Sequence, residues 1–294
     1  MFYRRKIILS ILQEFEGNLP KISLQKLLFL FANRQQKKDY EFVPYKFGCY
    51  SFSANADLVA MVKHGQVTED NKSFTKTDSI DYVKQLNVID KNIIYEIKKN
   101  YGGYDTNSLI KLTYLNYQYY AINSSIAKNV LTSAQYNKVL LAKPINDKTI
   151  LFTIGYEGIS LEQYLNRLIK NDVKVLIDVR SNALSMKFGF SKTQLKNFCA
   201  SVNIEYLHIP EVGIKSEQRK VLKTQSDYDN LFVDYKIQNL SVTMIQQLQI
   251  LQLLVQKKRI ALTCFESNIC QCHRKHLAEA IIKLPEWHYE SKHI

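Results

Sequence analysis

Residues 149–181, TILFTIGYEGISLEQYLNRLIKNDVKVLIDVRS, decide the fold of the second half of this chain. TILFTI and VKVLIDV are continuous apolar runs, which are typical of strands buried on both faces of a sheet. Between them, SLEQYLNRLIKND predicts a capped amphipathic helix. Strand, helix and strand in this order form a βαβ unit, so we predict a parallel sheet.

The same alternation continues to the end of the chain. We predict helices at 191–203, 243–259 and 272–283, and strands at 204–210 and 260–266. These elements predict an α/β domain over residues 149–294. In parallel sheets, sites gather beyond the carboxyl ends of the strands. The polar segments GYEG, DVRS, HIP and CFE all follow predicted strands, which predicts a site at that edge.

The first half has a different pattern, with short helices and little strand. Apolar residues recur at helical spacing in 4–17, in 23–35 with Ser23 as N-cap, and in 53–65 with Ser53 as N-cap. Residues 66–77 then predict a small hairpin, and further helices are expected at 79–99 and 105–122. This order predicts a mainly helical, winged-helix-like domain at 1–125, followed by a polar connection at 126–148.

Charge and composition narrow the class of protein. The 294 residues carry 40 Lys and Arg against 27 Asp and Glu, a formal net charge of +13. Both halves are basic, which favours a polyanionic partner such as nucleic acid, although a Lys-rich surface also serves solubility alone. The five cysteines do not suggest a disulfide framework. We expect a cytoplasmic protein without a signal peptide or membrane span.

The segment CFESNICQCHR at 264–274 carries the most reactive side chains. It joins a strand to a helix that begins near Cys272, and a helix N-terminus stabilises anions through its unpaired N–H groups. A cysteine at this position is expected to have a depressed pKa. We therefore predict Cys264 or Cys272 as a nucleophile, with His273 or Glu266 in proton transfer.

Other polar residues at the strand ends extend this predicted site. Arg180 and Arg274 are predicted to contact an anion such as phosphate or carboxylate. Asp178 and Glu157 are candidate general bases, or acceptors for ribose hydroxyl groups.

These residues also have structural interpretations. Cys264 fits a small core residue. Asp178 and Arg180 fit a structural ion pair. His208 fits a hydrogen-bonded core or surface histidine, and Gly155 fits a tight turn.

A metal site is the remaining alternative for the cysteine-rich segment. Cys272 and His276 are four residues apart on a helix, and with Cys264 and Cys270 they form a conceivable zinc quartet. The spacing lacks paired C-x-x-C motifs, however. We therefore expect no metal and no cofactor.

The first half resembles a known family. LQKLLFLF at 24–31, followed by YKFGCYSFSANADLVAMVKHGQV at 45–67, is similar to the Panacea-type domain found in antitoxins. Phe47 and Cys49 replace two positions of that family's turn. The resemblance implies a winged-helix-like module that binds nucleic acid or a protein partner.

The second half resembles the domain of unknown function 488. The motifs TIGYEG, LIDVRS, SMKFGFSKTQL, IEYLHIPEVG and CFESNICQCHR occur in that family's order. Ala183 replaces a usual Pro, and EVGIK replaces a Leu-Gly-Gly stretch, which affects the surroundings of His208 and Gly213. The positions that match the family pattern are Gly155, Tyr156, Glu157, Gly158, Asp178, Arg180, Ser185, Lys187, Phe190, Cys264, Glu266, Cys272, His273 and Arg274.

From these observations we expect a nucleic-acid-binding protein, with DNA favoured over RNA. Its α/β domain would accommodate a nucleotide-like ligand at Gly155, Tyr156, Glu157, Arg180, Ser185, Lys187, His208, Cys272, His273 and Arg274, and act on it or sense it. Cys264, Glu266 and Asp178 are the catalytic candidates, and the sequence leaves open whether a reaction occurs. One alternative is an antitoxin-like regulator that binds a protein partner. Another is a small-molecule hydrolase or transferase that uses Cys264 and Glu266.

Overall fold

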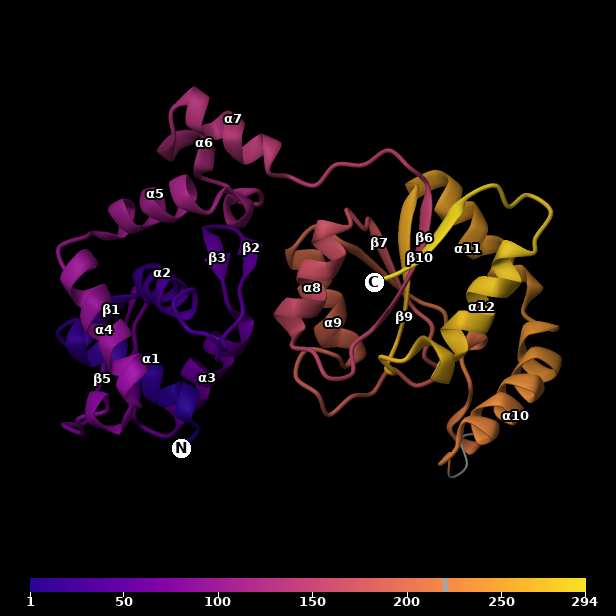
Figure 1. Cartoon of the computed structure of the whole chain (residues 1–294), viewed down its shortest axis with the longest axis horizontal. Coiled ribbons are helices and arrows are strands. Elements are labelled where there is room, and N and C mark those ends of the chain that lie inside the picture. The colour runs from indigo at the N-terminus through magenta and orange to yellow at the C-terminus, as the bar shows by residue number, and fades with distance from the viewer. Residues whose placement is uncertain (219–221) are drawn as a thin grey trace. The chain divides into compact units, whose positions relative to one another are not determined.

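The computed structural model describes residues 1–218 and 222–294 and divides into two compact units, Met1–Lys143 and Pro144–Ile294 (Figure 1). The fold is mixed α/β. The first unit is mostly helical, and the second contains a five-stranded parallel sheet. Each unit has hydrophobic clusters of its own. The predicted connection at 126–148 is largely helical, and its first 18 residues, 126–143, belong to the first unit.

The N-terminal unit begins with helices and short strands in alternation. Its elements are α1 (Tyr3–Glu14), β1 (Asn18–Pro20), α2 (Lys21–Ala32), β2 (Val43–Tyr45), β3 (Gly48–Tyr50), α3 (Phe52–Lys63), β4 (Val67–Glu69), β5 (Ser73–Lys76), the 3₁₀ turn η1 (Val83–Gln85), α4 (Val88–Tyr101), α5 (Thr106–Asn116), the 3₁₀ turn η2 (Gln118–Ala121), α6 (Ala127–Val130) and α7 (Ser133–Leu141).

Helix α2 is the centre of this unit. Ten of its 12 residues are buried, because α1, α4 and α5 all pack against it. Strands β1, β5 and β4 form an antiparallel sheet in that order, and β2 pairs with β3 in a separate hairpin.

Two predicted helix caps in this unit are wrong. Helix α2 begins at Lys21, so Ser23 lies inside it, and its hydroxyl contacts Thr106 Oγ1 at 2.8 Å. Helix α3 is capped by Ser51, whose Oγ accepts from the backbone N–H of Ala54, and not by Ser53.

The C-terminal unit alternates strands and helices. Its elements are β6 (Ile150–Gly155), α8 (Leu161–Lys170), β7 (Val175–Asp178), α9 (Lys192–Ser201), β8 (Glu205–His208), the 3₁₀ turns η3 (Pro210–Val212) and η4 (Ser216–Gln218), α10 (Gln225–Tyr235), the π-helical turn η5 (Lys236–Leu240), α11 (Met244–Lys257), β9 (Arg259–Cys264), the 3₁₀ turn η6 (Ile269–Gln271), α12 (His273–Ile282) and β10 (Glu290–His293).

The sheet has the order β10-β6-β9-β7-β8, and each neighbouring pair is parallel. Helices α8 and α9 lie on one face, and α10, α11 and α12 lie on the other (Figure 1). Because both faces are covered, every residue of β6, β7 and β9 is buried, which explains their continuous apolar runs. This confirms the predicted parallel α/β architecture. Strand β10 was not predicted, because all four of its residues are exposed and its sequence, ESKH, has no apolar pattern.

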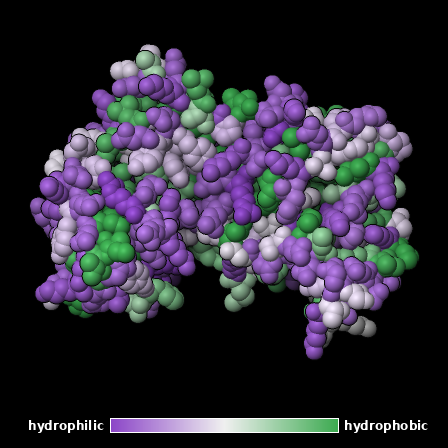
Figure 2. All heavy atoms as spheres, viewed as in Figure 1, coloured by the Kyte–Doolittle hydropathy of each residue, from purple (hydrophilic) through white to green (hydrophobic). Residues whose placement is uncertain are grey.

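Hydrophilic side chains cover most of the surface drawn in Figure 2, with apolar groups scattered among them. Among the residues described, no helix has the length and apolar character that crossing a membrane requires.

Candidate functional sites

The parallel register brings the predicted site residues of the C-terminal unit to one edge of the sheet. Cys264, the last residue of β9, lies opposite Gly155 at the end of β6. Asp178, the last residue of β7, lies opposite Thr263 on one side and His208 on the other. The strand ends of β6, β7, β8 and β9 therefore meet at one edge.

Asp178 and Arg180 form a buried ion pair at this edge. Arg180 donates from Nε to Asp178 Oδ1 at 2.8 Å and from Nη2 to Oδ2, and Tyr206 donates its hydroxyl to the same Oδ2 at 2.7 Å. Arg180 Nη1 also donates to the Tyr156 hydroxyl at 2.6 Å. Burial alone would lower the pKa of Arg180, but the hydrogen bonds and charge of Asp178 raise it. Both groups are thus engaged with each other, as in the structural interpretation of this pair.

A cavity of about 250 Å³ lies beside this ion pair. Tyr156 forms part of its wall and stacks on Phe190, with ring centroids 4.2 Å apart. Burial raises the pKa of Tyr156, while the charge of Arg180 and hydrogen bonds from Ser185 and Arg180 act against that rise. The lining residues are Tyr156, Arg180, Ser181, Asn182, Leu184, Ser185, Ile214, Cys264 and Phe265.

Lys187 and His208, which were also predicted as ligand contacts, interact with the backbone of residues that line this cavity. Lys187 Nζ donates to the backbone carbonyl of Tyr156 at 2.6 Å, and burial lowers the pKa of Lys187. His208 Nε2 contacts the carbonyl of Arg180 at 2.8 Å. Both side chains therefore fix backbone segments next to the cavity.

Arg274 and Glu157 brace the turn between β9 and α12. Arg274 is fully buried and donates from Nη1 to the carbonyl of Glu266 at 2.5 Å and from Nη2 to that of Ser267 at 3.4 Å. Glu157 Oε2 accepts from the backbone N–H of Ser267 at 3.0 Å and from its hydroxyl at 3.1 Å. Gly155 permits this approach, because a Cβ there would lie 1.9 Å from the Glu266 carbonyl oxygen. These contacts stabilise the turn. Both Nη atoms of Arg274 donate to backbone carbonyls, so the geometry supports a structural role for Arg274 and not the predicted anion contact.

The braced turn brings together Cys264, Cys272 and His273, all of which are buried. The two Sγ atoms and a ring nitrogen of His273 lie within 4.8 Å of one another. Cys264 Sγ is 3.7 Å from His273 Nδ1 and 3.1 Å from Glu266 Oε2. The four residues proposed for nucleophilic chemistry thus form one cluster, and Cys264 also lines the 250 Å³ cavity.

The expectation of a depressed thiol pKa at Cys272 is wrong. Cys272 occupies the N-cap of α12, where the helix dipole would favour a thiolate. Burial nevertheless raises the pKa of its thiol well above the ordinary value. The free-energy cost of desolvating a thiolate here therefore exceeds the stabilisation that the helix dipole gives it.

The zinc quartet considered from the sequence does not assemble. Cys270 is exposed, and its Sγ lies 4.0 Å from Lys275 Nζ. His276 Nδ1 instead contacts Glu279 Oε2 at 3.2 Å.

Sequence reasoning missed Tyr206, whose hydroxyl completes the Asp178 network. The available signal was its place in IEYLHIP, on the strand next to that of Asp178.

Sequence reasoning also missed a cavity of about 520 Å³ in the N-terminal unit. This cavity is lined by Pro20, Lys21, Ile22, Gln25, Lys26, Tyr45, Phe47, Gly48, Cys49, Tyr50, Asn55, Asn71, Lys72, Phe74 and Thr106.

Gln25 and Lys26, from the LQKLLFLF motif, hold the β2–β3 hairpin in place at the wall of this second cavity. Lys26 is 1% exposed, and its Nζ donates to the carbonyls of Phe47 and Cys49. Burial lowers the pKa of Lys26. Gln25 Oε1 accepts from the backbone N–H of Ser51 at 3.0 Å. The hairpin turn is tight, because a Cβ on Gly48 would lie 2.5 Å from the Tyr114 ring.

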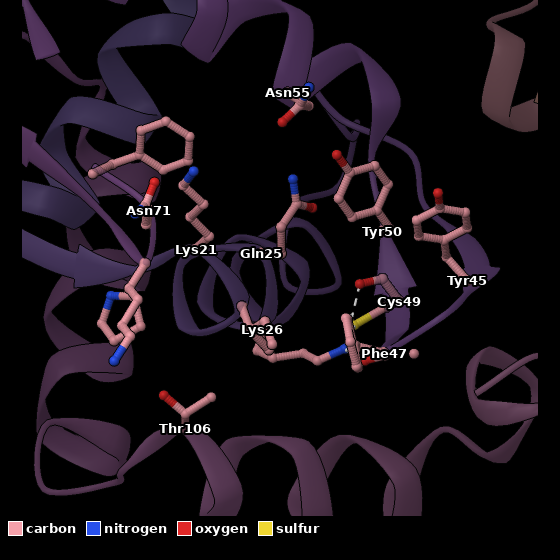
Figure 3. Close-up of a pocket in the computed structure, with 15 residues that line it drawn as sticks. Lys21, Gln25, Lys26, Tyr45, Phe47, Cys49, Tyr50, Asn55, Asn71 and Thr106 are labelled. Atoms are coloured by element: carbon pink, nitrogen blue, oxygen red, sulfur yellow. Dashed lines mark hydrogen bonds between the residues drawn. The ribbon is translucent and has the colours of Figure 1, made fainter. Parts of the chain in front are cut away.

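Figure 3 shows how the side chains of this cavity are arranged. Tyr45 and Tyr50 lie on one side and Asn71 on the other, with Gln25 and Lys26 of α2 between them. Two tyrosines of YLNYQYY at 114–120 contribute to the core of the N-terminal unit. Tyr117 and Tyr120 pack edge-on against Phe29, with centroids 4.9 and 4.7 Å away.

Comparison with known families bears on the C-terminal unit. Residues 160–281 match the family model described as Domain of unknown function DUF488. The C-terminal unit contains a DUF488 domain. The match includes Asp178, Arg180 and the whole cluster from Cys264 to Arg274, while the Gly155–Gly158 turn of the DUF488 motif pattern precedes it. A search of curated proteins finds no match to this chain.

Proposed function

We propose that the protein binds nucleic acid through its N-terminal unit and holds a base in the 520 Å³ cavity. The observation that carries this proposal is the cavity lining, which combines the rings of Tyr45, Tyr50 and Phe74 with the amines of Lys21 and Lys72. Aromatic rings stack on nucleobases of any sequence, and lysines contact the adjoining phosphates. Lys21 also pairs with Glu69 at 2.6 Å, whereas Lys72 is exposed in the β4–β5 turn.

The order of elements supports the same proposal. Apart from the β2–β3 hairpin inserted between α2 and α3, the order α1, β1, α2, α3, β4 and β5 is similar to that of winged-helix modules, and β1, β5 and β4 form one antiparallel sheet. Helix-turn-helix modules dock mainly on DNA, which makes DNA the favoured partner. The basic balance of the chain, with a net charge of +13, favours the association electrostatically.

We also propose that the 250 Å³ cavity of the DUF488 domain accepts the nucleobase part of a ligand more readily than its phosphate. Arg180 is the only cationic side chain among the described lining residues, and its charge is balanced by Asp178. Ser181, Asn182 and Ser185 offer hydroxyl and amide groups for hydrogen bonds, and Tyr156 offers a ring.

Fluorescence anisotropy with labelled oligonucleotides tests the proposal. The full-length protein is titrated with single-stranded DNA, duplex DNA and RNA of the same sequence at several salt concentrations. We expect affinity to fall steeply as salt rises. Tyr50→Ala should weaken binding by about 1–3 kcal/mol through lost stacking. Lys72→Ala should weaken it for all sequences and reduce the salt slope by about one.

Lys99→Ala is the matched control, because Lys99 is an exposed lysine on α4 that does not line the cavity. It should bind like the wild-type protein. Absence of binding to every oligonucleotide at low salt would exclude the proposal and leave the protein-partner alternative. Equal losses in Lys72→Ala and Lys99→Ala would mean that charge alone, and not the cavity, carries the binding.

A further inference from the structure

The cluster at the β9–α12 turn has the composition and spacing of a metal site. Cys264 and Cys272 supply sulfur and His273 supplies nitrogen, with all three ligand atoms within 4.8 Å of one another. Two ligands of one tetrahedral zinc, a thiolate and an imidazole, lie roughly 3.6 Å apart, given Zn–S of about 2.3 Å and Zn–N of about 2.0–2.1 Å. The 3.7 Å between Cys264 Sγ and His273 Nδ1 fits that separation.

The orientation of His273 is the second observation. Its Nε2 lies 3.0 Å from the backbone carbonyl of Val179, which can only accept a hydrogen bond. In the neutral ring Nε2 therefore carries the proton, and the lone pair of Nδ1 faces Cys264 Sγ, 3.7 Å away. Metal-binding histidines are oriented in this way, with the remote ring nitrogen donating to a carbonyl or carboxylate. Tyr235 packs edge-on against the same ring, with centroids 5.6 Å apart, which fixes it further.

We propose that Cys264, Cys272 and His273 bind a divalent zinc ion. Glu266 is one candidate for the fourth ligand: its Oε2 is 3.1 Å from Cys264 Sγ, but it lies outside the set of three mutually close ligand atoms, so its side chain would have to turn toward the ion. Because Cys264 also lines the 250 Å³ cavity, a water or ligand atom from that cavity is the alternative fourth ligand. Three protein ligands with one exchangeable position are typical of catalytic zinc sites. Both thiols bind as thiolates, so uptake of the ion releases their protons to solvent.

The surrounding structure is built to hold such a site. The three ligands lie at the two ends of one turn, and both Arg274 and Glu157 hydrogen-bond to the backbone of that turn. A turn held this firmly keeps its ligands in place before the ion arrives, which favours affinity. The inference concerns the DUF488 domain and does not depend on nucleic-acid binding by the N-terminal unit.

Metal analysis of the purified full-length protein tests the proposal. We expect about one zinc ion per chain, because the three ligand atoms surround a single position. Cys272→Ser should reduce the metal content at least about tenfold, because a ligand is lost. Cys270→Ser should keep the wild-type content, because Cys270 lies in the same segment but outside the cluster and is exposed.

Cobalt substitution of the wild-type protein provides a second measurement that does not depend on the folding of any variant. The protein is treated with a chelator and titrated with Co²⁺, and thiolate ligation is read from sulfur-to-cobalt charge-transfer absorption in the near ultraviolet. Saturation at one equivalent, with competition by Zn²⁺, supports the site. Absence of bound zinc together with absence of this absorption would overturn it. A metal content unchanged in Cys272→Ser would also overturn it, because the ion would then be bound elsewhere.

Discussion

At the residue scale, Gly155 decides how closely β6 and the β9–α12 turn approach. A Cβ at this position would lie 1.9 Å from the carbonyl oxygen of Glu266 and 3.1 Å from Arg274 Nη2. We therefore expect Gly155→Ala to lower the free energy of unfolding by about 3 kcal/mol, measured by urea denaturation. Gly158→Ala is the control, since Gly158 has φ +75° but nothing within 4 Å of an added Cβ. Gly158→Ala should lower the free energy of unfolding by about 1–2 kcal/mol. An equal loss in both variants would contradict the idea that the close approach at Gly155 sets the cost.

Also at this scale, the sequence predicted which residues meet at the sheet edge better than it predicted the contacts they make. Asp178, Arg180, Cys264 and His273 were expected near one another because they follow parallel strands or begin the next helix. Their roles depend on contacts between segments far apart in the chain. Arg180 could bind an anion or pair with Asp178, and only the observed geometry decides for the pair. Likewise, sequence spacing favoured His276 as a partner of Cys272, whereas the adjacent His273 points Nδ1 toward the cysteines.

At the scale of elements, strand β10 protects an edge of the parallel sheet. It pairs with β6 over Glu290–His293, and the backbone N–H of Ile294 donates to the carbonyl of Thr153 at 3.0 Å. Removal of residues 290–294 should expose the unpaired edge of β6 and lower the free energy of unfolding by about 2 kcal/mol, at roughly 1 kcal/mol per net hydrogen bond. Chemical denaturation and hydrogen exchange at Leu151 and Thr153 would measure this. Unchanged protection of these amides would contradict a stabilising role for β10.

The elements that could be predicted are those with a clear apolar period. Strands β6, β7 and β9 are buried on both faces, so their runs are unbroken and their existence follows from sequence. Strand β10 could not be found in this way, because its pairing with β6 rests on backbone hydrogen bonds. Cap positions were also harder to predict than helices. Ser51 and Ser53 are equally suitable N-cap residues by type, and only the path of the β3–α3 connection selects Ser51.

At the scale of the whole molecule, each of the two units has its own hydrophobic core. We also propose a different ligand for each unit. A ligand that binds only the folded state stabilises it by about 2.7 kcal/mol at 100 times its dissociation constant. For units of this size, that corresponds to a rise in melting temperature of about 5–10 °C. Calorimetry of the full-length protein should therefore show two transitions, which Gly155→Ala assigns by lowering the one that belongs to the DUF488 domain. We expect a chelator to lower that transition alone, and an oligonucleotide to raise the transition of the N-terminal unit. A single transition that both treatments shift would mean that the two cores unfold as one cooperative unit.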